Sequence, residues 1–245
     1  MFKRSSQKCR DKVEVFKGWV AEVTQHYDPS HAVQHFERVE KLALELAATE
    51  PRYNASEATI LRMAAWAHDV CDHKLCPAKE APSREAAMRK TLLYDCELSH
   101  VDTVRVLLIA DNISLSKEKA GKLNRAILQG SNCELLRDLV SDADKLDALG
   151  RQGLIRIVEH HAAQFSLLNE LGSTGKLLSD VRYLATEHLL PRQKYLCTAA
   201  AIEKSVALVF EMQMILQDDV ELERLCEQAL PRHLSSSMRQ SQGAM

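Results

Sequence analysis

The residues most suited to metal binding and proton transfer lie in one stretch of this chain, Met63–Lys74. It reads Met-Ala-Ala-Trp-Ala-His-Asp-Val-Cys-Asp-His-Lys, so His68 and Asp69 follow an apolar run directly. A helix this apolar is normally buried on all sides, and a buried imidazole beside a buried carboxylate needs partners for both groups. A metal ion satisfies both. Composition alone gives roughly half of such chains a His-Asp dipeptide by chance, so the surrounding residues must decide.

Two further segments supply ligands of the same kinds. His35 lies in an amphipathic helical pattern, and Asp144 lies in Val140–Ala148, where apolar and acidic residues alternate so closely that some acids must point inward. Together with His68 and Asp69 they form a mixed nitrogen and oxygen set. Such a set suits one octahedral divalent ion, Mn²⁺, Fe²⁺, Co²⁺, Ni²⁺ or Mg²⁺, better than a closed tetrahedral zinc site. The open coordination positions favour catalysis over a purely structural role.

Helices must position these residues, and the apolar spacing predicts where they run. The sequence predicts helices over residues 8–26, 32–48, from about 55, 83–94, 99–110, 150–161, 194–216 and 218–229. In the long helix 194–216, the predicted inward residues are Leu196, Ala199, Ile202, Val206, Val209 and Met212. Composition agrees with an all-α fold, because 8 Gly, 6 Pro and 5% aromatic residues are few while strong helix formers are plentiful.

Charge and cysteine content limit the class of protein. The formal net charge of −2 predicts neither nucleic-acid binding nor attraction to a membrane, and no apolar run reaches membrane-spanning length. The seven cysteines form no close Cys-x-x-Cys pair, which indicates reduced thiols and a cytoplasmic protein. The first ten residues are basic but lack the apolar segment of a secretory signal; a mitochondrial presequence is the alternative.

Three blocks of the chain resemble the HD superfamily of metal-dependent phosphohydrolases, in particular its small single-domain bacterial and fungal members. His31-Ala-Val-Gln-His-Phe-Glu-Arg-Val39 resembles the first-ligand helix of that family, and Ala67-His-Asp-Val-Cys-Asp-His-Lys74 resembles its metal helix. Asp142-Ala-Asp-Lys-Leu-Asp-Ala-Leu-Gly150 is similar to the segment with the closing aspartate. The resemblance implies a single all-α helical bundle with one metal ion between helices, held by His35, His68, Asp69 and Asp144.

The extent of this domain follows from the same pattern. We expect one HD-type helical domain over residues 1–230, whose motif-bearing core covers about 25–215, and a flexible C-terminal tail at 231–245. One departure from the family pattern concerns the position after His31, which is usually Asp and here is Ala32. The change removes a carboxylate that would orient water or a ligand.

The resemblance also assigns roles around the ion. Asp72 follows Asp69 by three residues, and family members often carry an acid there that activates water, which makes Asp72 the predicted general acid or base. Its alternative is an ion pair with Lys74. Asp142 is predicted to orient a ligand histidine through the ring nitrogen that does not bind the metal. Asp147 is predicted to serve packing or a salt bridge.

Four residues are predicted to bind the substrate: Lys74, Arg38, Lys119 and His31. The three cations could hold phosphate oxygens, and Arg156 is a further candidate for this role. For His31, the alternative is a helix-start residue near Asp28. The alternative for each cation is an ordinary solvated residue on the protein surface, with no role in binding. His160-His161 has no partner at ligand spacing and is interpreted as a helix face.

Function follows as a hypothesis with two rivals. The leading hypothesis is a divalent-metal-dependent phosphohydrolase acting on a small nucleotide, with pyrophosphate release from nucleoside triphosphates favoured by the resemblance and manganese among the expected ions. The first rival is a metal- and nucleotide-binding HD module with little or no turnover. Ala32 supports this alternative, because it replaces the carboxylate that is usual at this position in the family. The second is an HD-type di-iron oxygenase, which needs further histidine ligands; His73 and His100 are the only ones between the His-Asp pair and Asp144.

Overall fold

Helices are the only regular secondary structure among the residues that the structure, a computed structural model, describes, namely 11–72, 75–168 and 174–230. The predicted all-α class is therefore confirmed. The α-helices are α1 (Lys12–Val23), α2 (Val33–Thr49), α3 (Ala58–Ala67), α4 (Ala81–Lys90), α5 (His100–Asp111), α6 (Leu115–Lys119), α7 (Arg125–Gly130), α8 (Glu134–Asp147), α9 (Gly150–Leu168), α10 (Thr174–Leu184), α11 (Ala199–Gln217) and α12 (Asp219–Ala229). The predicted tail at 231–245 lies outside the described residues.

Short tight elements join these helices. Three are 3₁₀ turns, η1 (Pro29–His31), η2 (Ala55–Glu57) and η5 (Leu190–Tyr195), and two are π-helical, η3 (Thr91–Asp95) and η4 (Ala185–Leu189). Within the described part of the chain, no helix combines the length and apolarity that crossing a bilayer requires.

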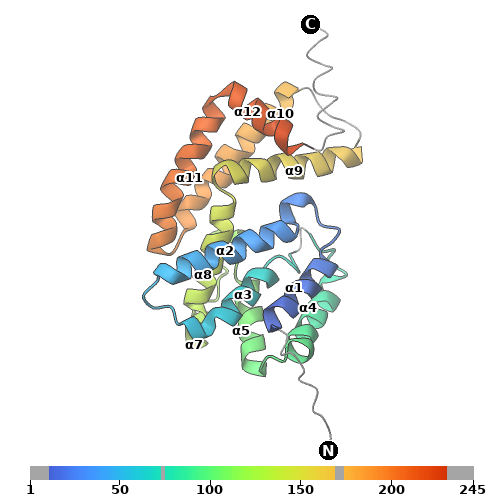
Figure 1. The fold of residues 1–245 in the computed structure, drawn as a ribbon, viewed down its shortest axis with the longest axis vertical. Coiled ribbons are helices and arrows are strands. Elements are labelled where there is room, and N and C mark those ends of the chain that lie inside the picture. The colour runs from blue at the N-terminus through green and yellow to red at the C-terminus, as the bar shows by residue number, and fades with distance from the viewer. Residues whose placement is uncertain (1–10, 73–74, 169–173, 231–245) are drawn as a thin grey trace, which may run out of the picture.

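Buried apolar side chains form two clusters. One is built mainly from α1, α2, α3, α5 and α8, in the lower half of Figure 1, and the other from α9 to α12 in the upper half. Helix α11 contacts both, because Ala201 belongs to the first cluster and Met212 to the second. The two clusters are therefore joined by a shared helix, while the division of the chain into domains stays a prediction.

A buried carboxylate ties together the three helices at the centre of the lower cluster. Glu40 on α2 accepts hydrogen bonds from Arg62 Nε at 2.5 Å and from Trp66 Nε1 at 2.7 Å, both on α3, and pairs with Lys17 Nζ of α1 at 2.8 Å. A buried charge persists only when several partners compensate it. These contacts fix the relative position of α2 and α3, which carry His35 and His68.

Helix α3 ends where its polar residues begin. The Val70 N–H donates to Ala67 O at 3.3 Å, and the Asp72 N–H donates to Asp69 O at 3.2 Å, so the backbone tightens into i to i−3 turns after Ala67. Tyr27 Oη donates to the Val70 carbonyl at 2.8 Å, a buried bond that anchors this turn to the segment before α2. His68 and Asp69 thus lie at a helix end, where the chain can point both side chains toward a neighbouring helix.

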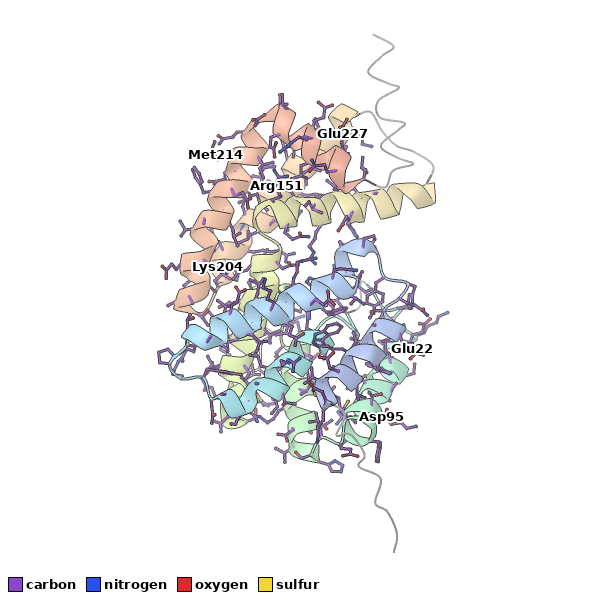
Figure 2. The ribbon with its side chains drawn as sticks, in the orientation of Figure 1. Glu22, Asp95, Arg151, Lys204, Met214 and Glu227 are labelled. Atoms are coloured by element: carbon purple, nitrogen blue, oxygen red, sulfur yellow. The ribbon has the colours of Figure 1, made fainter. Side chains whose placement is uncertain are left out.

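The buried face of α11 agrees with the predicted one at Val209 and Met212, and at Leu196 just before the helix, and differs from it at three other positions. The predicted inward positions Ile202 and Val206 are 47% and 61% exposed, and Ala199 is exposed as well. Ala201 and Ser205 are instead fully buried. The apolar stripe continues along the exposed side to Met214, which projects away from the molecule in Figure 2.

Helix α11 packs closely against the start of α9 through its larger side chains. A Cβ on Gly150, whose φ is +64°, would lie 3.0 Å from Leu208 Cδ2, and one on Gly153 would lie 3.0 Å from Met212 Cε. The two glycines of α9 permit this approach. The small buried residues of α11 contact other elements: Ala201 belongs to the first cluster, and Ser205 Oγ accepts from Gln193 Nε2 of η5 at 3.0 Å.

Position 32 is the N-cap of α2. Ala32 has the extended conformation of an N-cap, with φ −75° and ψ 179°, and provides no side-chain hydrogen bond to the helix. An Asp there would accept from the free N–H groups of the first turn, a contact that contributes about 1 kcal/mol. We therefore expect Ala32→Asp to raise the thermal unfolding midpoint by about 2–4 °C. Circular dichroism melts of wild type, Ala32→Asp and Ala32→Asn check this; a lower midpoint for both variants would exclude the capping role.

Candidate metal centre

Four of the predicted ligands meet in one place. His35 reaches the centre from α2, His68 and Asp69 from the end of α3, and Asp144 from α8. His35 Nε2 lies 3.2 Å from His68 Nε2, 3.5 Å from Asp69 Oδ2 and 3.6 Å from Asp144 Oδ1. His68 Nε2 lies 3.3 Å from Asp69 Oδ2 and 4.0 Å from Asp144 Oδ1. The structure thus brings together two imidazoles and two carboxylates that are up to 109 residues apart in sequence (35 to 144).

The charges at this centre favour a bound cation. Burial lowers the pKa of the His68 imidazole, but the carboxylates of Asp69 and Asp144 outweigh it and raise that pKa to about 9. Burial raises the pKa of Asp69, while His68 and His35 hold it well below its usual range. Without an ion the centre must therefore keep a proton to balance its carboxylates. A divalent ion provides the same compensation, and it would displace that proton.

The donor atoms also have the spacing that an ion requires. Two ligand atoms about 2.1 Å from one ion lie about 3.0–3.4 Å apart at angles near 90–109°. The separations from His35 Nε2 are 3.2, 3.5 and 3.6 Å, close to this spacing. The residues present therefore fit a divalent ion, which His35, His68, Asp69 and Asp144 would hold. Which divalent ion binds stays a prediction.

The carboxylate of Asp147 contacts the nitrogen of the His35 ring that faces away from the centre. His35 Nδ1 lies 2.8 Å from Asp147 Oδ2, which leaves Nε2 for the centre. Asp147 also accepts from Arg38 Nε at 2.6 Å and from Arg156 Nη1 at 3.0 Å. Burial raises the pKa of Asp147, but the bonds from His35 and Arg38 outweigh it and lower that pKa. Asp147 is therefore an ionised acceptor that orients the His35 ring.

The prediction that Asp142 has this orienting role is wrong. Asp142 accepts from the Cys197 N–H at 2.9 Å, the Thr198 N–H at 2.7 Å and Thr198 Oγ1 at 2.8 Å. Burial raises its pKa, and these bonds act against that effect. Asp142 thus fastens α8 to the N-terminus of α11. Asp147 forms the predicted salt bridges, with Arg38 and Arg156, and in addition orients the histidine.

The contacts of Asp147 predict an effect on ion binding. In Asp147→Asn the side chain keeps its volume but loses the charge that orients His35 and compensates Arg38 and Arg156. We expect the affinity for Mn²⁺ to fall by about 10–100-fold. Isothermal titration with Mn²⁺ measures this, and Asp142→Asn is the matched control because it removes a buried charge of α8 on the other side. Equal losses in both variants would contradict a specific role for Asp147.

Arg192 is a cation near the centre that the sequence interpretation missed. It lies in η5, which packs against α8. Burial lowers the pKa of its guanidinium, and the carboxylates of Asp144 and Asp69 act against this, so it lies within electrostatic reach of both. Its Nε donates only a long bond, 3.4 Å, to the His188 carbonyl, and it forms no ion pair with a carboxylate of the described residues. The guanidinium is therefore available to an anion at the centre.

The predicted substrate residues have different positions. His31 lies beside the centre, with its ring 6.1 Å from that of His35. Two donors of Arg38 are taken by Asp147, so a contact of Arg38 with substrate stays a prediction. Lys119 is exposed, and its Nζ lies 5.5 Å from the ring centre of Tyr195, at the end of η5. Lys74 falls outside the described residues.

Asp72, the predicted proton-handling residue, lies in the turn after the centre. It is half-buried, and its carbonyl accepts from the Leu75 N–H at 3.0 Å and the Cys76 N–H at 2.8 Å. These bonds turn the chain immediately after Asp72, three residues beyond the ligand Asp69. Its chemical role stays a prediction.

Comparison with known proteins gives a fold but no family assignment by sequence. No protein-family model and no curated protein matches the chain. Bacillus subtilis YpgQ in complex with ADP superposes with a TM-score of 0.59 at 21% identity, covering 84% of this chain and 92% of that one. A Lactobacillus plantarum protein gives a TM-score of 0.63 at 20% identity, covering 85% and 94%.

A third solved structure bears a family description. It is an HD-superfamily hydrolase from Bacillus thuringiensis, with a TM-score of 0.57 at 21% identity, covering 85% of this chain and 95% of that one. The resemblance drawn from the sequence motifs is therefore confirmed at the level of fold. This chain has an HD-type helical fold over most of its length, and its four donor residues lie where three helices of that fold meet.

Proposed function

We propose that this HD-type protein is a divalent-metal-dependent phosphohydrolase that acts on a small nucleotide. The observation that carries the proposal is the meeting of His35, His68, Asp69 and Asp144, at ion-binding distances, beside the available guanidinium of Arg192. The fold it shares with an HD-superfamily hydrolase supports the reaction class, and the ADP bound to YpgQ supports a nucleotide.

The protein's own residues have distinct tasks in this proposal. When bound, a divalent ion supplies Lewis-acid chemistry that activates water and neutralises phosphate charge. Arg192 binds phosphoryl oxygens and stabilises the charge that develops on them, since a guanidinium pairs with such oxygens through two parallel N–H groups. Asp147 keeps His35 in the orientation that presents Nε2. Asp72 takes a proton from the attacking water or gives one to the leaving group.

A substrate screen tests this function. Purified protein is incubated with nucleoside mono-, di- and triphosphates and with general phosphate esters, each with Mn²⁺, Mg²⁺, Co²⁺ or Ni²⁺. Phosphate and pyrophosphate are measured separately, and pyrophosphate from triphosphates is the product we favour. Ion binding and nucleotide binding without turnover under every condition would exclude the hydrolase and favour the rival, a metal- and nucleotide-binding module.

The role of Asp72 has its own test. Asp72→Asn keeps the size of the side chain but cannot exchange a proton, so we expect turnover to fall by about a hundredfold while ion content stays unchanged. Steady-state kinetics and metal analysis of the same preparation provide both values. Asp111→Asn, an exposed acid at the end of α5, is the control. Full turnover in Asp72→Asn would remove Asp72 from the mechanism.

A further inference from the structure

A second group of ligand-type residues lies beside the metal centre. Asp28 and His31 come from the segment around η1, and His160 comes from α9, which packs against η1. Each contributes a donor atom, and the three atoms lie within 4.8 Å of one another. The spacing of His160 in the sequence gives no hint of this group, because 129 residues separate it from His31 (31 to 160).

The Asp28 carboxylate contacts both imidazoles of this group, and His31 Nδ1 also lies 2.8 Å from Ser30 Oγ. Asp28 Oδ2 lies 3.2 Å from His31 Nδ1 and 3.6 Å from His160 Nδ1. Asp147, which hydrogen-bonds to a histidine and two arginines, has its contacts at 2.6–3.2 Å, so the His160 distance alone is longer than these. Charge-assisted N–H···O bonds are about 2.7–2.9 Å long, whereas two ligands of one ion lie about 3.0–3.4 Å apart. The separations in this group match those between the donors of the first centre.

The carboxylate of Asp28 is held in place by its own turn. Its Oδ1 accepts from the Ser30 N–H at 2.9 Å and from Ser30 Oγ. Oδ2, the oxygen nearer both imidazoles, faces the group. Burial raises the pKa of Asp28, but its contacts with His160, His31 and Ser30 outweigh it and hold that pKa far below its usual range. The group therefore contains an oriented, ionised oxygen between two imidazole nitrogens.

The group of Asp28, His31 and His160 is partly open to solvent, so a metal ion could enter and leave it. The side chains of Asp28, His31 and His160 are 17%, 26% and 44% exposed, whereas that of His35 in the first centre is fully buried. A half-open group of two imidazoles and one carboxylate is the donor set of many transition-metal sites with free coordination positions. Water or a substrate oxygen would complete the coordination.

We infer that Asp28, His31 and His160 bind a second divalent transition metal ion, next to the first centre. The two groups are neighbours, since the His31 and His35 rings lie 6.1 Å apart. The site itself does not depend on the proposed function. Its consequence does rest on that function: a second positive charge here would bind the distal phosphate of a nucleotide whose reacting phosphate lies at the first centre.

Metal counting tests the site without an activity assay. Untagged protein is stripped with chelator, dialysed against Mn²⁺ and washed, and bound manganese per chain is measured by mass spectrometry. We expect two ions in wild type, one in His160→Ala, one in Asp69→Ala and none in the double variant. His161→Ala is the matched control, because it removes a neighbouring imidazole of α9, and it should retain two ions.

Two variants distinguish an ion site from a local hydrogen-bond network. Asp28→Asn keeps hydrogen bonding to Ser30 but weakens ion binding, so it should lower the count by one as His160→Ala does. A wild type that binds one ion, or a His160→Ala protein that still binds two, would overturn the inference. Circular dichroism spectra that match wild type show that each variant is folded. Because the count is made even in the inactive Asp69→Ala protein, failure of this site is separable from failure of the proposed hydrolase.

Discussion

Asp69→Ala is expected to lose the ion of the first centre and all detectable phosphohydrolase activity, with its helical structure retained. Asp69 Oδ2 lies 3.5 Å from His35 Nε2 and 3.3 Å from His68 Nε2, so its removal deletes one of four donors and one of two negative charges. The remaining imidazoles and Asp144 do not complete the set, and without the ion no Lewis acid activates water. Metal analysis and the nucleotide assay measure both losses.

The fold should tolerate this change because Asp69 lies at a helix end with a partly exposed side chain. That side chain is 19% exposed, and α3 ends at Ala67, before it. Asp95→Ala is the control, since Asp95 is an exposed acid at the lower edge of the molecule in Figure 2. If Asp69→Ala binds as much manganese as wild type, or keeps its activity, the centre as described is wrong.

Much of the helical fold was predictable because local patterns dominate it. The expected helix 32–48 agrees within one residue at each end with α2, and 218–229 agrees equally well with α12. The face of α11 was not predictable from hydrophobicity. Ser205 is buried where its hydroxyl accepts from Gln193 Nε2 of η5, and Ala201 is buried in the first cluster, among residues of α2 and α8. These contacts come from the tertiary fold, which no local pattern encodes.

Helical geometry accounts for the exchanged roles of two acids on α8. Residues three apart on a helix share a face, whereas residues two apart point in nearly opposite directions. Asp144 and Asp147 are therefore on the side of His35, and Asp142 is on the side of α11, as their contacts show. The same rule places Arg38 with His35 on α2, where both reach Asp147. The sequence contained this information once α8 was taken as a helix.

Arg192 is a different case, because its position depends on the tertiary fold alone. It lies 48 residues after Asp144 (144 to 192) in a short 3₁₀ element, and an arginine in such a segment is usually a surface residue. Only the packing of η5 on α8 brings it within reach of Asp144 and Asp69. His160 escaped prediction for the same reason, since the packing of α9 on η1 places it beside Asp28.

Arg192→Ala is expected to lower kcat/KM for the nucleotide substrate by about 100–1,000-fold, the effect of removing one preorganised charge-stabilising group. The guanidinium lies in the field of Asp144 and Asp69 and is half-buried, so its interaction with a phosphoryl oxygen is partly shielded from water. If it acts on the developing charge of the transition state, the loss appears mainly in kcat; a loss confined to KM indicates ground-state binding alone.

The affinity for Mn²⁺ is the second measurement for Arg192→Ala. Loss of a ligand such as Asp69 lowers this affinity, whereas loss of Arg192 should not. Arg192 is a positive charge near the carboxylates that hold the ion, so its removal should leave the affinity for Mn²⁺ unchanged or raise it. Lys194→Ala removes an exposed cation from the same 3₁₀ element and should behave as wild type. Arg192→Lys keeps the charge but not the paired donors, and should recover part of the activity. A fall in ion affinity equal to the fall in kcat/KM would show that Arg192 supports the centre structurally and does not act on the phosphate.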